Sequence, residues 1–307
     1  MIDLKIVVPE DFYQEEIRDG YLVTKETKEL WAVELDLLAE LDRICKKYAI
    51  EYMACGGTML GALRHKGFIP WDDDIDVMMT WENYNRLCEI GPFEFRDPYF
   101  FQTDYTDRGS ARGHIQIRNS NTTAILMSEL EQKYQFNQGV FIDVFCLDHI
   151  PDDNKERNSF FEEIKDTKTK ALKAVNRTYR YSKAVRSKTP LLKRTIKDIL
   201  CPFFKVLKVE EIANYRFENS IHKYNNIKTK EMGLVCILKI GQRYCWESID
   251  LNSKKKDVPF EFLQIPVPAN FDNILTKTYG EWHEFVVGTN NHGELFTDID
   301  HSYKKYI

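Results

Sequence analysis

The stretch from Cys55 to Met79 constrains this chain most, because a glycine turn is followed by four aspartates within five residues. The pattern predicts a short strand, the turn Gly56-Gly57-Thr58, a short helix, a loop and a second strand. A glycine turn that opens a helix presents backbone N–H groups and suits a phosphate. Crowded carboxylates require a cation, hydrogen-bond donors or full solvation. Together these features predict phosphoryl-group chemistry with a divalent metal.

The aspartates follow the alternation of a strand. Side chains alternate between the two faces, so Asp74 and Asp76 point the same way with Ile75 between them. Asp72 shares this orientation if the strand extends back that far, whereas Asp73 faces away. Plain solvated acids are the simpler alternative, which the apolar residues around the run disfavour.

A third acidic position lies in the apolar run Phe141–Phe145. Burying Asp143 there is costly unless the carboxylate is paired, protonated or bound to a metal. If its strand lies beside the first aspartate strand, Asp143 completes a three-carboxylate site. The alternative is a salt bridge to Arg118 or Arg64. Asp148, further along, is expected to be a turn residue.

Groups that suit an anion follow the glycine turn. Arginine can bind phosphate through two nitrogens, and lysine supplies a point charge. His65 is a phosphate donor, a proton-transfer group or a structural hydrogen bonder, and Trp71 either stacks on a base or braces the acidic loop. Arg118 is a second phosphate ligand or a salt-bridge partner. The candidate substrate-binding residues are Gly57, Thr58, Arg64, His65, Lys66, Trp71 and Arg118.

Size and composition place the chain among ordinary globular proteins. Its 307 residues, 43% of them hydrophobic, can form one large core or two smaller ones. A net charge of −5 does not indicate nucleic acid. We expect a cytoplasmic protein, since the sequence shows neither a signal peptide nor a membrane-spanning run. Seven scattered cysteines without a C-x-x-C pair predict reduced core thiols.

The wider pattern predicts an α+β or mixed α/β fold. A long helix over Thr27–Tyr48 precedes the β-α-β start, and several strands follow it. We divide the chain into a catalytic core at 1–150, a basic helical insertion at 151–230, and strands and a helix at 231–307 that complete the core. The further predicted strands are Glu51–Cys55, Ile75–Thr80, Pro98–Thr103, Gly113–Arg118, Thr122–Met127, Gly139–Cys146, Gly233–Ile240 and Tyr244–Ile249.

Proline and glycine positions add local expectations. Pro190 separates two helices, and Pro202 kinks or ends the second. Residues 258–268 are expected to form an edge strand and a loop, because prolines forbid a central position. Asn270 is the expected cap of a helix that Gly280 ends. The tail from Val287 is expected to be irregular.

The helical insertion contains a basic segment. Residues 165–208 carry fourteen lysines and arginines against two aspartates, a net charge of +12. The simpler explanation is a solvated helical face. The alternative is contact with an anionic polymer, a phosphate-rich acceptor or a membrane surface. An RNA-binding role has no module motif behind it.

The stretch Gly57–Asp76 resembles the signature of the LicD family of phosphotransferases, which includes bacterial phosphorylcholine transferases and has distant fukutin-type ribitol-phosphate relatives. Leu41–Tyr48 and Phe141–Asp148 resemble the family's preceding helix and its second acidic strand. Val267-Pro268 followed by Ile274–Glu281 resembles its closing block. Cys146, where proline is expected, and the residues after Glu281 depart from the pattern.

The resemblance implies a nucleotidyltransferase-like mixed sheet with flanking helices. It also implies transfer of a phospho-alcohol, foremost phosphocholine, from a CDP-linked donor to a hydroxyl of a teichoic acid, lipopolysaccharide or capsule glycan. Arg64, Lys66 and the Gly57-Thr58 amides would hold the phosphates, and Asp143 is a candidate proton acceptor. The expected cofactor is Mg²⁺, with Mn²⁺ as the alternative. Its expected ligands are Asp72, Asp74, Asp76 and Asp143, the last three being the candidate catalytic residues.

Two other classes of function remain open at this point. One is a metal-dependent glycosyltransferase or nucleotidyltransferase, which shares the metal and nucleotide chemistry but transfers another group. The other is a non-catalytic binder of an anionic glycan or membrane through the basic helices. In the favoured reading the acceptor is a glycan, lipid-linked at the inner membrane face, and nucleic acid is not a partner.

Overall fold

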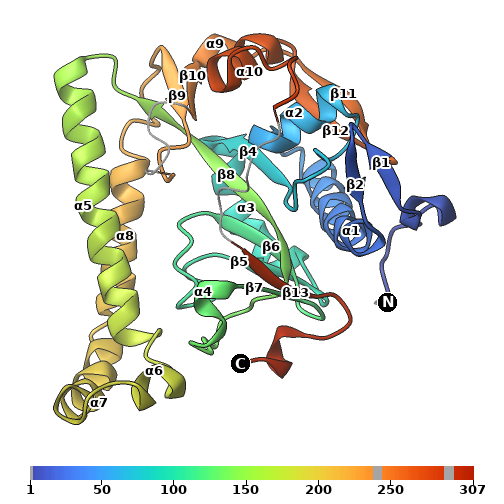
Figure 1. Ribbon diagram of the computed structural model, residues 1–307. Helices are drawn as coiled ribbons and strands as arrows, with labels where there is room; N and C mark the ends of the chain where they lie inside the picture. Colours follow the sequence, from blue (N-terminus) through green and yellow to red (C-terminus); the bar gives the residue numbers. More distant parts are fainter. Residues whose placement is uncertain (1–2, 238–243, 287–293) are drawn as a thin grey trace.

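A computed structural model describes residues 3–237, 244–286 and 294–307, and a mixed sheet forms the centre of these residues (Figure 1). Its strand order is β10-β9-β8-β4-β3, and β6 and then β5 extend from β8. β4 runs parallel to β8, whereas β6 and β9 are antiparallel to it. The strands are β3 (Met53–Ala54), β4 (Asp76–Thr80), β5 (Tyr99–Gln102), β6 (Ile115–Asn119), β8 (Val140–Ile150), β9 (Glu231–Gly233) and β10 (Cys245–Glu247).

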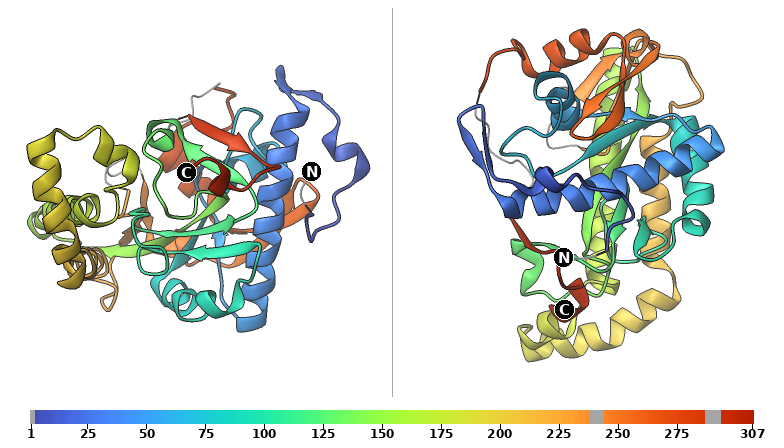
Figure 2. Two further views of the ribbon diagram at one scale, coloured as in Figure 1. Left: turned by 90° about the horizontal axis from the view of Figure 1, so that it is seen from below. Right: turned by 90° about the vertical axis from the view of Figure 1, so that its right-hand side faces the viewer.

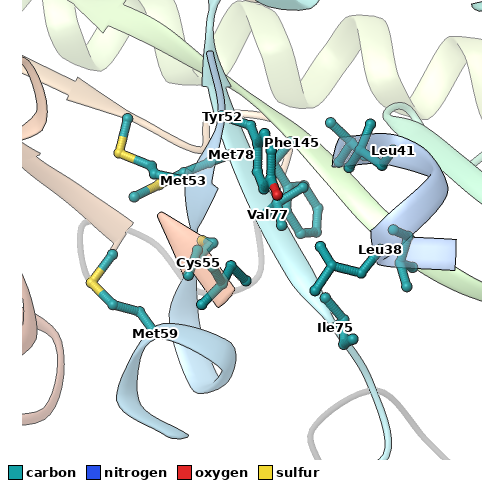
Figure 3. Close-up of a cluster of buried hydrophobic side chains, with 14 of the residues drawn as sticks. Leu38, Leu41, Tyr52, Met53, Cys55, Met59, Ile75, Val77, Met78 and Phe145 are labelled. Carbon is teal, nitrogen blue, oxygen red and sulfur yellow. The ribbon is translucent and has the colours of Figure 1, made fainter. Parts of the chain in front are cut away.

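The long helix α1 (Lys25–Tyr48) confirms the sequence prediction and packs on β6 and β8. Thr24 caps it by accepting from the Thr27 N–H, and its apolar residues recur at helical spacing. Leu38 and Leu41 point from α1 toward side chains of β4 and β8 (Figure 3). This buried layer fixes the two strands on which the acidic residues lie.

Two more helices frame the sheet. α2 (Gly56–Arg64) starts one residue after β3, so the predicted turn Gly56-Gly57-Thr58 forms the first turn of the helix. α3 (Trp81–Glu94) follows β4 and packs on β4 and β8. The chain therefore runs from β3 through α2 and the acidic run to β4, which pairs antiparallel with β3. Helices packed on a mixed sheet agree with the α+β class that the sequence predicts.

Three two-stranded elements surround the central sheet. β1 (Glu16–Arg18) and β2 (Tyr21–Val23) form a hairpin around Asp19-Gly20, a common turn pair. The stretch expected as an edge strand and a loop is instead a second hairpin, β11 (Lys255–Phe260) with β12 (Leu263–Pro268). Prolines are tolerated there because a two-stranded hairpin has no central position. β7 (Thr123–Leu126) pairs with β13 (Leu295–Asp298).

A helical arm stands to one side of the sheet (Figures 1 and 2). It has its own small core, in which Phe160 and Ile164 of α5 meet Phe217 and Ile221 of α8. Pro190 separates α6 from α7 as predicted, but Pro202 lies inside α7 and does not end it. The arm consists of α5 (Asn154–Thr178), α6 (Lys183–Ser187), α7 (Leu191–Val206) and α8 (Val209–Ile221).

The remaining short elements are η1 (Glu10–Tyr13), α4 (Met127–Leu130), α9 (Ser248–Leu251), α10 (Phe271–Tyr279) and η3 (Tyr303–Lys305). Asn270 precedes α10, but its side chain bonds Asp250 Oδ1 at 3.0 Å rather than capping the helix. The prediction of an irregular tail is wrong at Leu295–Asp298, because these residues form β13. Parts of that tail (287–293) and of the predicted strand Gly233–Ile240 lie outside the described residues.

Two further expectations can be compared with the structure. All seven cysteines are free thiols, and all except Cys88 are buried, which confirms the prediction of reduced core thiols. Among the described helices, none combines the length and apolarity needed to cross a bilayer.

Candidate active site

Three polar residues form one row across three adjacent strands. Asp76 on β4 pairs in register with Asp143 on β8, and Asp143 pairs with Gln116 on β6. Residues in register project from the same face of a sheet, about 5 Å apart. The predicted adjacency of the two acidic strands is therefore confirmed. Gln116 joins the row from a strand in which the sequence analysis identified only Arg118.

The glycine turn lies against these carboxylates. Gly56 has a φ of +51°, and a Cβ there would lie 3.7 Å from Asp76 Oδ2 and 3.8 Å from the Tyr279 hydroxyl. A Cβ on Gly57 would meet Asp72 Oδ2 at 2.6 Å. Gly56 thus needs glycine for its positive φ, and Gly57 needs it because Asp72 occupies the space that a Cβ would fill. Asp72 and Asp76 lie at the end of α2 where the helix dipole favours negative charge.

Asp76 is the most crowded of the acids. Burial raises its pKa well above the usual value, and the neighbouring charges of Asp74, Asp143 and Asp72 raise it further, in that order. Its Oδ1 is buried and has no hydrogen-bond partner among the described residues. Its backbone N–H donates to Thr58 Oγ1 at 2.8 Å, which fixes the start of β4 beside α2. Asp76 therefore lies within electrostatic reach of three other carboxylates.

Asp143 is shifted in the opposite direction. Burial raises the pKa of its carboxyl group, but His114, Gln116 and Arg118 together lower it below the usual value. His114 Nε2 lies 3.1 Å from Asp143 Oδ1, and Gln116 Nε2 donates to the same oxygen at 2.6 Å. Asp143 is therefore held ionised, whereas Asp76 resists ionisation. Neither Arg118 nor Arg64 forms the alternative salt bridge to Asp143 within the described part of the chain.

Arg118 does not lie where a phosphate ligand should. It is buried, and its guanidinium donates to Gln102 Oε1 at 2.6 Å, to the Gly139 carbonyl at 2.6 Å and to Gln116 Oε1. The expectation of direct substrate contact is therefore wrong. Arg118 instead orients Gln116, whose amide N–H group then faces Asp143.

A further buried acid approaches the run from α1. Glu34 is 2% exposed, and its Oε2 has no hydrogen-bond partner among the described residues. Burial raises the pKa of Glu34 well above the usual value, and the charges of Asp74 and Asp73 raise it further. Trp31, one helical turn earlier, donates from Nε1 to the Asp72 carbonyl at 2.9 Å. α1 therefore supports the acidic loop and adds a carboxyl group behind it.

The basic residues after α2 are placed unequally. His65 Nδ1 lies 2.7 Å from Asp19 Oδ2, its Nε2 accepts from Arg64 Nε, and its side chain is 1% exposed. His65 is therefore a structural hydrogen bonder and not a substrate ligand. Arg64 donates to the carbonyls of Trp282 and Glu284, which ties the end of α2 to the C-terminal segment. Only Lys66 is exposed, at a φ of +58°.

Three other predicted positions have structural roles. The ring of Trp71 meets Tyr21 edge to face at a centroid distance of 5.9 Å, an arrangement that braces the loop. The Thr58 side chain is occupied by the Asp76 N–H, which leaves its backbone as the part facing a ligand. Asp148 is no turn residue, because it is buried within β8 and bonds His222 and Asn225.

Sequence reasoning missed Glu34, His114, Gln116 and Tyr279 as neighbours of the site. Each is a single polar residue on a separate element, so no local spacing connects it to the acidic run. Of these four, only Tyr279 could have been found from the sequence, since it lies in the block near the C-terminus that resembles the family pattern.

The oxygen-rich donor set suits a hard divalent cation. Mg²⁺ and Mn²⁺ prefer carboxylate oxygens, and crowded carboxylates are stabilised when a cation neutralises them. The unpartnered Oδ1 of Asp76 and the ionised Asp143 meet that requirement. The residues present therefore fit a divalent metal.

Part of the chain is similar to known proteins. Residues 49–170 match the family model for the LicD/FKTN/FKRP nucleotidyltransferase domain. Over 121 residues the chain is 33% identical to the lipopolysaccharide cholinephosphotransferase LicD of Haemophilus influenzae. The matched region covers 39% of this chain and 44% of that protein.

Shorter matches occur with uncharacterized rickettsial proteins. One from Rickettsia prowazekii is 39% identical over 56 residues, covering 18% of this chain and 21% of that protein. One from Rickettsia typhi is 38% identical over 56 residues, covering 18% of each. The matched regions thus span less than half the length of these curated relatives.

Proposed function

We propose that this chain is a phosphotransferase, because residues 49–170 match the family model for the LicD/FKTN/FKRP nucleotidyltransferase domain and the chain is similar to a cholinephosphotransferase. Its substrate is a CDP-linked phospho-alcohol, with phosphocholine the first candidate, and its acceptor is a hydroxyl group of a cell-surface glycan. Lipopolysaccharide is the first candidate acceptor because the Haemophilus relative is named for it, and teichoic acid and capsule follow. The register of Asp76 beside Asp143, next to the glycine start of α2, is the observation that carries the proposal.

Asp72, Asp74, Asp76 and Asp143 would hold Mg²⁺ or Mn²⁺. The ion supplies positive charge that stabilises the phosphates during transfer. Gln116 and His114 keep Asp143 ionised and oriented. The Thr58 hydroxyl fixes Asp76 by accepting a hydrogen bond from its backbone N–H. The lowered pKa of Asp143 makes it a good ligand and a poor proton acceptor, so we assign it to ligation rather than to general-base catalysis.

The donor's phosphates would lie at the start of α2. Backbone N–H groups at a helix N-terminus are suited to phosphate. Lys66, exposed at the other end of the same segment, is the side chain left to contribute a positive charge. Arg64 contributes indirectly, because it holds the segment that carries Trp282 in place.

A transfer assay with product mass tests the proposal. Purified protein is incubated with CDP-choline, CDP-ribitol, CDP-glycerol or a UDP-sugar, each with lipopolysaccharide or teichoic acid and with or without Mg²⁺. We expect a phospho-alcohol mass addition that requires the metal and is lost in Asp143→Asn. Asp257→Asn, an exposed aspartate on β11, is the matched control.

The other outcomes identify the alternatives. Addition of a sugar or of a nucleoside monophosphate would replace the proposal with a glycosyltransferase or a nucleotidyltransferase. No transfer, together with no stabilisation by any CDP compound and Mg²⁺ in thermal unfolding, would indicate a non-catalytic binder.

A further inference from the structure

Helix α7 presents a continuous apolar stripe to solvent at the far end of the helical arm. Its large side chains recur with the four- and three-residue steps of a helix face. Leu192 is 76% exposed, Ile199 68% and Val206 81%, which is unusual for residues of this size in a packed helix. The exposed apolar residues are Leu191, Leu192, Ile196, Ile199, Leu200, Phe203, Val206 and Leu207.

The opposite side of α7 faces the arm. Cys201 is buried, and its Sγ lies 2.7 Å from the Arg177 carbonyl at the end of α5. Lys197 and Lys205 lie over the rings of Tyr181 and Tyr179. The helix is therefore docked by its other face, and nothing in the described part of the chain covers the apolar stripe.

Positive charge surrounds this stripe. Residues 183–208 contain eight lysines and arginines and one aspartate. Asp198 pairs with Arg186, and Lys188 pairs with Glu131, so only part of the excess is balanced. The basic residues are Lys183, Arg186, Lys188, Lys193, Arg194, Lys197, Lys205 and Lys208.

We propose that α7 is an in-plane anchor that inserts its apolar stripe into the surface of an anionic lipid bilayer. Helices with an apolar face, a lysine-rich polar face and modest overall hydrophobicity lie in the membrane interface. α7 has 16 residues, so it is about 24 Å long and too short to cross the hydrocarbon core. A soluble polyanion would account for the lysines but gives no reason to expose eight large apolar side chains.

The position of α7 suits this role. The arm extends from the end of β8, and α5 has 25 residues, about 37 Å of helix between the sheet and the tip. Docking at the tip would leave the acidic site accessible to solvent and to a lipid-borne acceptor. The anchor is independent of the phosphotransfer reaction, so either proposal can fail without the other.

Vesicle co-sedimentation of the full chain tests the anchor. Vesicles of phosphatidylcholine alone are compared with vesicles that contain phosphatidylglycerol. We expect binding at least tenfold tighter to the anionic vesicles, and at least a tenfold loss in the variant Leu192→Ser/Ile199→Ser/Phe203→Ser. The matched control, Ile17→Ser/Phe93→Ser/Ile249→Ser, alters equally exposed apolar residues elsewhere and should bind as wild type does.

Charge reversal separates the contribution of the basic residues from that of the apolar stripe. Lys193→Glu/Arg194→Glu/Lys197→Glu should also weaken binding to anionic vesicles tenfold or more. The proposed anchor is overturned if the wild type does not bind anionic vesicles. It is also overturned if charge reversal weakens binding but the serine variant does not. It is also overturned if α7 mediates self-association, seen by light scattering as an oligomer that the serine variant abolishes. Transfer to a soluble acceptor should stay unchanged in the serine variant, which separates this test from that of the proposed function.

Discussion

The acidic site and the basic arm concentrate opposite charges, but they hold them in different ways. At the site, backbone register places Asp76 beside Asp143, and α1 adds the buried Glu34 behind them. On the arm, lysines and arginines extend from helices into water, and only some of them have partners. Buried like charges change one another's protonation, whereas exposed like charges are screened.

This difference indicates what each region requires. A crowded set of rigid carboxylates would be stabilised by one small ion, as the proposed metal site requires. On the arm, water and salt screen the repulsion between the exposed basic side chains. A basic surface of this kind beside an apolar stripe suits an extended anionic surface. Mutations should therefore affect the site through chemistry and stability, and the arm through association alone.

The largest effect is expected for Asp76→Asn. Turnover should fall on the order of a thousandfold or more, because a ligand carboxylate is lost from the reacting centre. Without metal the variant should unfold at a higher temperature than the wild type near neutral pH, because a carboxyl group whose pKa is raised by folding costs stability there and the amide does not. Initial rates and thermal unfolding in EDTA measure both. Near-normal turnover would remove Asp76 from the site, and Asp257→Asn controls for loss of a surface charge.

An intermediate effect is expected for Gln116→Ala. The side chain links Arg118 to Asp143, and loss of such supporting contacts typically costs about 10- to 100-fold in metal affinity or activity. Titration of Mn²⁺ into the variant measures the affinity. Gln135→Ala, at an exposed position, is the control. Equal affinities for Gln116→Ala and wild type would show that Asp143 is positioned by the strand alone.

The alternation of a strand and the run of acids predicted much of this site. The register confirms the predicted adjacency of the strands that carry Asp76 and Asp143, whereas the shared face of Asp74 and Asp76 stays a prediction because Asp74 precedes β4. Residues on separate elements were not predictable in the same way, because Glu34 and Gln116 meet the acids only after α1 and β6 have packed. For His65 and Arg118 the sequence left a substrate-binding and a structural role open, because charge pattern alone does not reveal burial, and both side chains are satisfied inside the fold.

The same limit applies to the arm. The basic composition and Pro190 predicted helices of high positive charge. Which residues of α7 stay exposed depends on how it docks against α5, and that was not readable from the sequence.

A smaller, pH-dependent effect is expected for Glu34→Gln in metal-free protein. The pKa of Glu34 is raised in the folded state, so the wild type loses stability as pH rises above about 4.3, the value in an unfolded chain. The variant lacks this loss. It should unfold like the wild type near pH 4 and be more stable at pH 7.5 by about 1 to 3 kcal/mol. Urea unfolding at the two pH values measures the difference, and a constant gap would contradict the assignment.

The smallest effect is expected on the arm. Lys193→Glu/Arg194→Glu should change the free energy of unfolding by no more than about 0.5 kcal/mol, as is usual for surface positions. Transfer to a soluble acceptor should stay within twofold of wild type. Urea unfolding and initial rates measure these quantities. A large loss of turnover would mean that the arm contributes to the reaction and would break the distinction between the two regions.

Binding of Mn²⁺ tests the central claim most directly. The free ion is followed by electron paramagnetic resonance during titration of the wild type, Asp76→Asn, Asp143→Asn and Asp257→Asn. The account predicts saturable binding to wild type and Asp257→Asn, and its loss in both Asp76→Asn and Asp143→Asn. Equal binding by all four proteins would contradict a metal site built from the aspartates of β4 and β8.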